Sequence, residues 1–115
     1  RRPEGRQILK SLVPPLQVSL GERDEMLMVS GFTDDRPVQA TNQRFADNLE
    51  LSAQRALTVT RALIQEGMPP QRVFSAAFGA EQPVASNASE KGRALNRRVE
   101  MAPVPKAAPS TPKVP

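Results

Sequence analysis

Carboxylates and guanidinium groups are the side chains of this sequence best suited to chemistry, because its 115 residues include no cysteine and no histidine. Their absence excludes thiol nucleophiles, imidazole acid–base catalysis and the usual zinc sites. The adjacent acids Asp34 and Asp35 could hold a metal or work as an acid–base pair, but no third ligand accompanies them. We therefore expect a binding protein without a metal or other cofactor, and not an enzyme.

The net charge of +4 favours an acidic or polyanionic partner, which could be nucleic acid, anionic lipid or a cell-wall polymer. A nucleic-acid adaptor is disfavoured, because the chain offers no Trp or Tyr and only four Phe for bases to stack on. No apolar run approaches the roughly 20 residues that span a bilayer, and no signal peptide opens the sequence. We expect no nucleic-acid partner.

The composition divides the chain into one domain and a tail. Hydrophobic residues make up 38% of the sequence, which is enough for one compact domain with a modest core at residues 1–101. Residues 102–115 contain five of the twelve prolines and almost no bulky side chains. They cannot bury enough surface to offset the entropy of ordering, so we predict a disordered tail.

The clearest predicted element is a helix that begins at Asp47 and ends before Gly67. Asp47 followed by Glu50 resembles a capping box, and Gly67 ahead of Pro69-Pro70 is a stop signal. Helical spacing predicts a core face made of Leu49, Ala53, Ala56, Leu57, Thr60, Leu63 and Ile64.

The other expected elements alternate between helices and strands. The first is a short amphipathic helix at Gly5–Leu16, which Pro14-Pro15 would end or kink. A polar turn follows at Gly21–Asp24. We expect strands at residues 26–31, 73–78 and 98–101, a long loop at 32–46, and a short helix that starts at Asn87 with Glu90. Strands separated by helices favour right-handed βαβ crossovers, so we expect an α+β fold with helices covering one face of one sheet.

Three segments taken together resemble the OmpA C-terminal family of peptidoglycan-binding domains. They are Gly31-Phe32-Thr33-Asp34, Leu51-Ser52-Ala53-Gln54-Arg55-Ala56 and Gly92-Arg93-Ala94-Leu95-Asn96-Arg97-Arg98-Val99-Glu100. Each is weak alone, but their order and spacing match the family over about residues 5–101. The resemblance implies a βαβαβ sandwich with a mixed sheet. Asp34-Asp35, the long loop and residues 48–52 are most similar to MotB-type flagellar stators.

Two features depart from the family pattern. Phe32 stands where the family commonly has histidine, which leaves the neighbouring acid in place. The family's first strand has no counterpart ahead of Arg6. If that strand is missing from the molecule, a sheet edge or a core face is exposed.

The resemblance implies a ligand, which is the diaminopimelate residue in the stem peptide of peptidoglycan. Its free end carries one ammonium and one carboxylate. Asp34 can accept from the ammonium, and Arg55 can hold the carboxylate with two parallel hydrogen bonds. By family position the predicted ligand-binding residues are Asp34, Arg55, Asn48, Thr33, Ser52, Arg97 and Arg98.

Helix geometry supports this grouping. Asn48 and Arg55 are seven residues apart, so they share one side of the long helix, and that side is expected to face the loop carrying Asp34. Asn48 and Ser52 lie in the first turns, where free N–H groups and the helix dipole favour a carboxylate. Arg97 and Arg98 could complete the site or orient Asp34, and a purely structural Asp34–Arg55 ion pair is the alternative.

The stator resemblance also implies a location and partners. It predicts a periplasmic domain that dimerises weakly and anchors a membrane-embedded channel partner to the wall. An upstream segment, absent from this sequence, would supply the inner-membrane anchor. The alternative is another OmpA-like envelope anchor, such as a lipoprotein or a secretion-system component.

Overall fold

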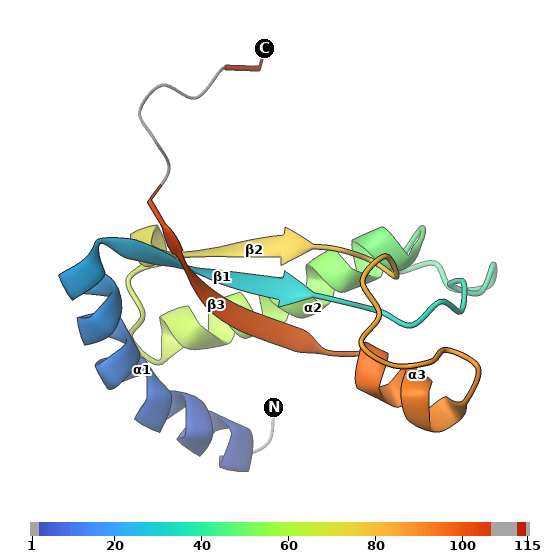
Figure 1. Ribbon diagram of the computed structural model, residues 1–115, viewed down its shortest axis with the longest axis horizontal. Coiled ribbons are helices and arrows are strands. Elements are labelled where there is room, and N and C mark those ends of the chain that lie inside the picture. The colour runs from blue at the N-terminus through green and yellow to red at the C-terminus, as the bar shows by residue number, and fades with distance from the viewer. Residues whose placement is uncertain (1–2, 107–112, 115) are drawn as a thin grey trace.

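The sheet is built around the strand β1 (Glu25–Gly31). In the computed structural model, which describes residues 3–106 and 113–114, β1 lies between β2 (Val73–Ala77) and β3 (Val99–Pro105) (Figure 1). β1 pairs in parallel with β2 and antiparallel with β3, so the sheet is mixed. The helix α2 (Asn48–Gln65) and a 3₁₀ turn at Pro70–Arg72 connect the two parallel strands, which confirms the predicted βαβ unit.

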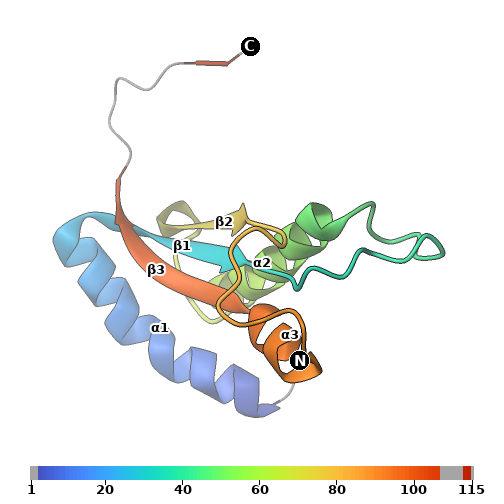
Figure 2. The ribbon, with the colours of Figure 1, turned by 45° about the vertical axis from the view of Figure 1, so that its right-hand side comes forward.

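Two helices cover one face of this sheet. Figures 1 and 2 show α1 (Pro3–Arg23) and α2 on the same side of the three strands. Their buried side chains form one core with those of β1, made of Val13, Leu20, Leu27, Val29, Ala56, Leu63, Met68 and Val73. The α+β prediction with helices on one face is therefore confirmed.

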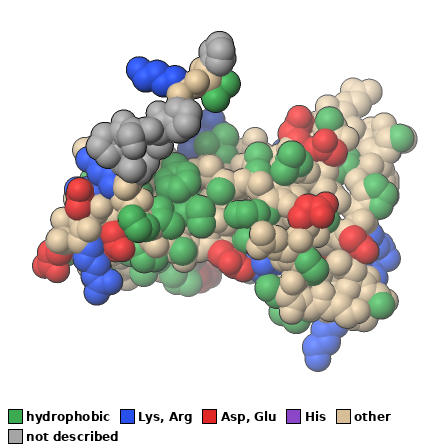
Figure 3. Space-filling model, turned by 45° about the horizontal axis from the view of Figure 1, so that its top comes forward, with side chains coloured by type: hydrophobic (Ala, Val, Ile, Leu, Met, Phe, Trp, Pro, Cys, Tyr) green, Lys and Arg blue, Asp and Glu red, His purple; other side chains and the backbone are tan. Residues whose placement is uncertain are grey.

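The surface is divided by side-chain type. Leu27 and Val29 of β1 point into the core, so the alternate residues Met26 and Met28 lie on the opposite face of the sheet, where both are half-buried. In Figure 3 hydrophobic side chains gather across the middle of the molecule, and charged side chains lie mainly toward its two ends.

The first helix is longer than predicted. α1 continues through Pro14 and Pro15 to Arg23, so the predicted end near Leu16 and the predicted turn at residues 21–24 are both wrong. Both prolines face solvent, where water can satisfy the carbonyls that lose an N–H partner. Val13 and Leu20, buried before and after the prolines, hold the two halves of the helix on the core.

The helix α2 begins and ends where the sequence predicts. Asp47 caps it by accepting a hydrogen bond from the Glu50 backbone N–H at 2.9 Å. The Glu50 carboxylate reaches back to the N–H of Ala46, one residue earlier than a standard capping box requires. At the other end Gly67 adopts a left-handed φ of 112°, which glycine tolerates at little cost.

The predicted core face of α2 is partly wrong. Leu49 and Ala53 are exposed, whereas Ser52 is completely buried alongside Ala56 and Thr60. The buried stripe is rotated from the predicted one because the Ser52 hydroxyl, completely buried, binds the backbone N–H of Gly79. A polar side chain is tolerated there since its hydroxyl makes two hydrogen bonds.

Two boundaries near the C-terminus also differ from prediction. The helix α3 (Glu90–Asn96) is capped by Ser89, whose hydroxyl accepts from Gly92 N–H at 3.0 Å, and not by Asn87. Strand β3 extends to Pro105, so the predicted disorder from residue 102 is wrong for residues 102–105. Prolines fit there because β3 is an edge strand. Residues 107–112 and 115 of the predicted tail lie outside the described residues.

The edge of β3 that faces away from β1 has no strand partner among residues 3–106. No strand precedes α1 in the described chain, in keeping with the missing family strand noted in the sequence. None of the helices in the described part of the chain is long and apolar enough to cross a membrane.

Candidate functional site

Asp34 lies in a buried position just after β1, where the long loop begins. Only 8% of its surface is exposed. Its Oδ2 accepts from Arg97 Nη1 at 2.8 Å, and its Oδ1 accepts from the backbone N–H of Arg36 at 3.0 Å. A carboxylate has about four acceptor positions, so Asp34 can still accept a hydrogen bond from a ligand.

The pKa of Asp34 reflects two opposing effects. Burial raises the pKa of this carboxyl, but the hydrogen bonds from Arg97 and from the Arg36 N–H outweigh burial and lower it below the ordinary value for Asp. The carboxyl is therefore ionised at neutral pH. It presents a fixed negative charge rather than a group that exchanges protons.

Asn48 and Arg55 reach the same loop from α2, as their spacing predicts. Arg55 Nη1 donates to the carbonyl of Phe32 at 3.3 Å, and Asn48 Nδ2 donates to the carbonyls of Arg36 at 2.9 Å and Asp34 at 3.3 Å. The bond from Arg55 uses one of the five N–H donors of a guanidinium. The rest of its planar fork remains for a ligand carboxylate.

The alternative of a structural Asp34–Arg55 ion pair is not what the structure contains. Within the described residues Asp34 pairs with Arg97, and Arg55 contacts a backbone carbonyl. Arg55 therefore holds a positive charge close to Asp34 without being neutralised by it. Separate negative and positive groups beside one loop can receive the two ends of a zwitterion.

Ser52 and Thr33 support the site from beneath. Ser52 is fully buried, and its hydroxyl donates to the Leu49 carbonyl at 2.8 Å and accepts from Gly79 N–H at 2.9 Å. Thr33 is also buried, and its backbone N–H donates to the Gly79 carbonyl at 2.8 Å. The sequence predicts that Ser52 contacts the ligand directly, but a fully buried side chain cannot do so in this arrangement. Both residues instead hold the loops together.

Arg97 and Arg98 have different roles, which the sequence alone could not separate. Arg97 bridges Asp34 and Glu90, the first residue of α3. Arg98 lies over the Phe32 ring, with its guanidinium carbon 3.8 Å from the ring centroid, and donates to the Gln82 carbonyl at 3.0 Å. Arg97 therefore belongs to the charged site, and Arg98 positions the start of the loop.

A groove of about 680 Å³ opens beside Asn48. It lies between the loop after β1, the start of α2 and the loop after β2. Its lining includes the carboxylates of Asp35, Asp47 and Glu81 together with apolar groups from Val38, Leu49 and Phe78. The groove gives an extended ligand a path along the surface next to the Asp34 loop.

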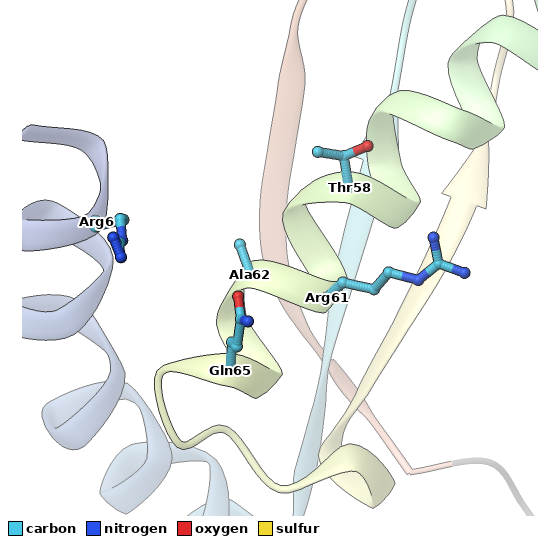
Figure 4. Close-up of a pocket in the computed structure, with 5 residues that line it drawn as sticks. All are labelled: Arg6, Thr58, Arg61, Ala62 and Gln65. Carbon is cyan, nitrogen blue, oxygen red and sulfur yellow. The ribbon is translucent and has the colours of Figure 1, made fainter. Parts of the chain in front are cut away.

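A second hollow, of about 410 Å³, lies between α1 and α2 and is lined by Arg6, Thr58, Arg61, Ala62 and Gln65 (Figure 4). Figure 4 shows the Arg61 side chain extending away from α1, on which Arg6 stands. The two cations do not converge, so they form no clamp for an anion. We do not assign this hollow a ligand.

The described residues contain no group of three or more carboxylates that could hold a metal ion. The chemistry available at the site is the binding of charged and hydrogen-bonding groups.

Two residues of the site were not predicted from the sequence. The sequence indicates Glu90 only as a helix-start signal, although Arg97 follows seven residues later as the C-cap of the same short helix, which places both on one side of it. Gly79, whose φ is +61°, is the other. Its backbone binds both Ser52 and Thr33, which no sequence pattern indicates.

Comparison with known proteins agrees with this arrangement. The model of the OmpA family matches residues 2–97. Motility protein B of Helicobacter pylori is 42% identical over 73 residues, which cover 64% of this chain and 28% of that protein. The peptidoglycan-binding protein ArfA of Mycobacterium tuberculosis is 36% identical over 78 residues, covering 68% of this chain and 22% of that protein.

A solved structure extends the likeness to the fold. A crystal form of the C-terminal domain of Helicobacter pylori MotB (residues 125–256) superposes with a TM-score of 0.77 at 30% identity, covering 93% of this chain and 78% of that chain. The chain spans less than a third of the length of the two curated relatives. The match over residues 2–97, the shared fold and the three motifs together show that the chain belongs to the OmpA family.

Proposed function

We propose that this domain binds peptidoglycan non-covalently through the diaminopimelate of its stem peptide. The observation that carries the proposal is the placement of one acid and one arginine beside the same loop. Asp34 is held ionised by Arg97, while Arg55 contacts the carbonyl of Phe32, two residues before Asp34. An ammonium would bind at Asp34 and a carboxylate at Arg55, which together match the free amino-acid end of diaminopimelate.

The comparisons support the choice of polymer. ArfA is named as a peptidoglycan-binding protein, and it shares this domain. The site suits such a ligand because it offers fixed charges beside a surface groove. The domain would hold the wall rather than cut it.

The likeness to MotB supports a mechanical role. We propose that the domain lies in the periplasm and anchors a flagellar stator, whose channel partner and inner-membrane anchor would be reached through upstream sequence. Non-covalent attachment would give the torque generator a fixed reaction point while still allowing exchange. Weak homodimerisation is part of this proposal, and sedimentation equilibrium at millimolar concentration would measure it, with strictly monomeric behaviour counting against it.

Wall binding is tested by sedimentation of the domain with purified sacculi. Arg55→Ala and Asp34→Asn should each lower affinity about tenfold to a hundredfold, because hydrogen bonds between charged groups contribute roughly 1.5–3 kcal/mol. Arg55→Lys should also bind poorly, since it keeps the charge but loses the planar fork. Arg61→Ala, on the exposed side of the same helix, is the matched control and should bind like wild type.

Circular dichroism melts of each variant separate binding from folding. If a folded Arg55→Ala pelleted with sacculi like the wild type, the site assignment would be wrong. If the wild type itself failed to pellet, the proposed function would be wrong.

A further inference from the structure

A second carboxylate stands behind the Asp34 site. Glu90 Oε2 accepts from Arg97 Nη2 at 3.1 Å, and its Oε1 accepts from Nη1 at 3.4 Å. The same Nη1 donates to Asp34 Oδ2 at 2.8 Å. One guanidinium therefore bridges two carboxylates, one buried and the other on the exposed start of α3.

Cations crowd this cluster. Arg36 interacts electrostatically with both Asp34 and Glu90. Arg93 Nε lies 3.9 Å from Glu90 Oε1. Among the described residues, Glu90 is the carboxylate that pairs with Arg93 as well as with Arg97. Without Glu90, the positive charges of Arg97 and Arg36 would act on Asp34 with no second carboxylate paired to Arg97.

We propose that Glu90 is a positioning residue for the ligand: it shares Arg97 with Asp34 and offsets part of the positive charge there, so that Asp34 attracts the ligand's ammonium more strongly. This inference rests on the proposed peptidoglycan function. An Asp34–Arg97 pair alone is formally neutral and would attract an incoming cation little. Glu90 adds one negative charge beside Arg97 and Arg36, so the surroundings of Asp34 are less positive than they would be without it.

Glu90 also gives Arg97 a second partner. The Arg97 side chain is about one-third exposed and Glu90 is more exposed still, so this end of the cluster can adjust when a ligand arrives. A ligand ammonium can donate to the acceptor positions of Asp34 that remain open, while Arg97 shifts toward Glu90. The effect should therefore concern the ammonium of the ligand and not its carboxylate, which Arg55 would hold.

The test compares two soluble probes by calorimetry. One is a stem tripeptide that ends in diaminopimelate with a free amino group, and the other is the same tripeptide with that amino group acetylated. Glu90→Gln preserves the shape and an acceptor but removes the charge. We expect it to weaken binding of the free-amine probe about threefold to tenfold and to leave the weaker binding of the acetylated probe nearly unchanged.

Glu22→Gln is the matched control, because it removes the same charge from an exposed position on α1. It should bind both probes like the wild type. Thermal melts of Glu90→Gln check that the short helix α3 stays folded. A variant that binds both probes like the wild type, or that weakens both equally, would overturn the role of Glu90. If the wild type bound neither probe, the peptidoglycan proposal itself would fail, and the two failures are therefore distinguishable.

Discussion

Arg97 and Asp34 are 63 positions apart in the sequence, yet Arg97 Nη1 donates to Asp34 Oδ2 at 2.8 Å. The contact closes the loop after β1 against the junction of α3 and β3. It therefore ties together the first and third of the family motifs. The lowered pKa of Asp34 therefore depends partly on a residue that reaches it only in the folded state.

This contact predicts how stability depends on pH. Burial raises the pKa of the Asp34 carboxyl, but the hydrogen bonds from Arg97 and the Arg36 N–H lower it by more than burial raises it. The pKa of Asp34 in the folded protein is therefore below its value in the unfolded chain. An acid whose pKa is lower in the folded protein stabilises the fold. This stabilisation is fully present above the pKa of about 3.9 that Asp has in the unfolded chain, and it is lost as the pH falls through the pKa of the folded protein. Wild type should therefore exceed Asp34→Asn in stability at pH 7, and the difference should shrink below about pH 4.

Urea unfolding of both proteins between pH 7 and pH 2 measures this difference. Asp24 and Glu90 also have lowered pKa values, through hydrogen bonds from Arg72 and Arg97 respectively. Both remain in the two proteins, so the contribution of Asp24 cancels, and the difference reports Asp34 together with any change at Glu90, which shares Arg97. A difference that stayed constant down to pH 2 would contradict the linkage.

Ser52→Ala should destabilise the domain by about 1–3 kcal/mol, because the Gly79 N–H would be left buried without its acceptor. Chemical denaturation gives the free energy of unfolding. Thr58→Ala is a suitable control, since its hydroxyl bonds back to the Gln54 carbonyl on the exposed side of the same helix. It should change stability by less than about 0.5 kcal/mol. Equal effects of the two substitutions would argue against a stabilising hydrogen bond between Ser52 and the Gly79 N–H.

Gly31 and Gly5 should respond in opposite ways to alanine. A Cβ at Gly31 would lie 2.0 Å from the backbone oxygen of Ser52, whereas a Cβ at Gly5 meets nothing within 4 Å. Gly31→Ala must push α2 away from β1 and should cost about 3 kcal/mol or more. Gly5→Ala, in a helix, should stabilise by about 0.5–1 kcal/mol. Thermal melts would show both signs, and a wild-type-like Gly31→Ala would disprove the close approach of strand and helix.

The sequence predicts the sheet and the long helix well because their signals are local. The apolar run ending at Gly31, the cap at Asp47 and the stop at Gly67 each act within a few residues. The extent of α1 could not be predicted in this way. Pro14 and Pro15 normally end a helix, and only the packing of Val13 and Leu20 against the sheet outweighs them.

The candidate site shows the same division. The side of α2 that carries Asn48 and Arg55 follows from helical spacing, and both residues do reach the Asp34 loop. The burial of Ser52 does not follow, because it depends on the backbone of Gly79 in a distant loop. The separate roles of Arg97 and Arg98 depend likewise on contacts made only in the folded domain.

The C-terminal boundary of the domain can be tested by two truncations. β3 pairs with β1 as far as Pro105, and Ala102 and Val104 lie opposite Met28 and Met26. Removing residues 107–115 takes away a segment whose composition, AAPSTPKVP, offers little apolar surface. We expect this shorter chain to melt close to the full-length protein.

Removing residues 102–115 should have a different result. It deletes more than half of β3, breaks the pairing with the first four residues of β1 and uncovers Met26 and Met28 on the open face of the sheet. A loss of 1 kcal/mol lowers the melting temperature of a domain this small by roughly 4–8 °C, so the drop should be easy to measure. Since Asp34, Arg55 and Arg97 all lie before residue 102, the protein that remains folded should still pellet with sacculi. Equal melting temperatures for the two truncations would mean that residues 102–105 contribute nothing to the sheet, and the domain would then end at Met101.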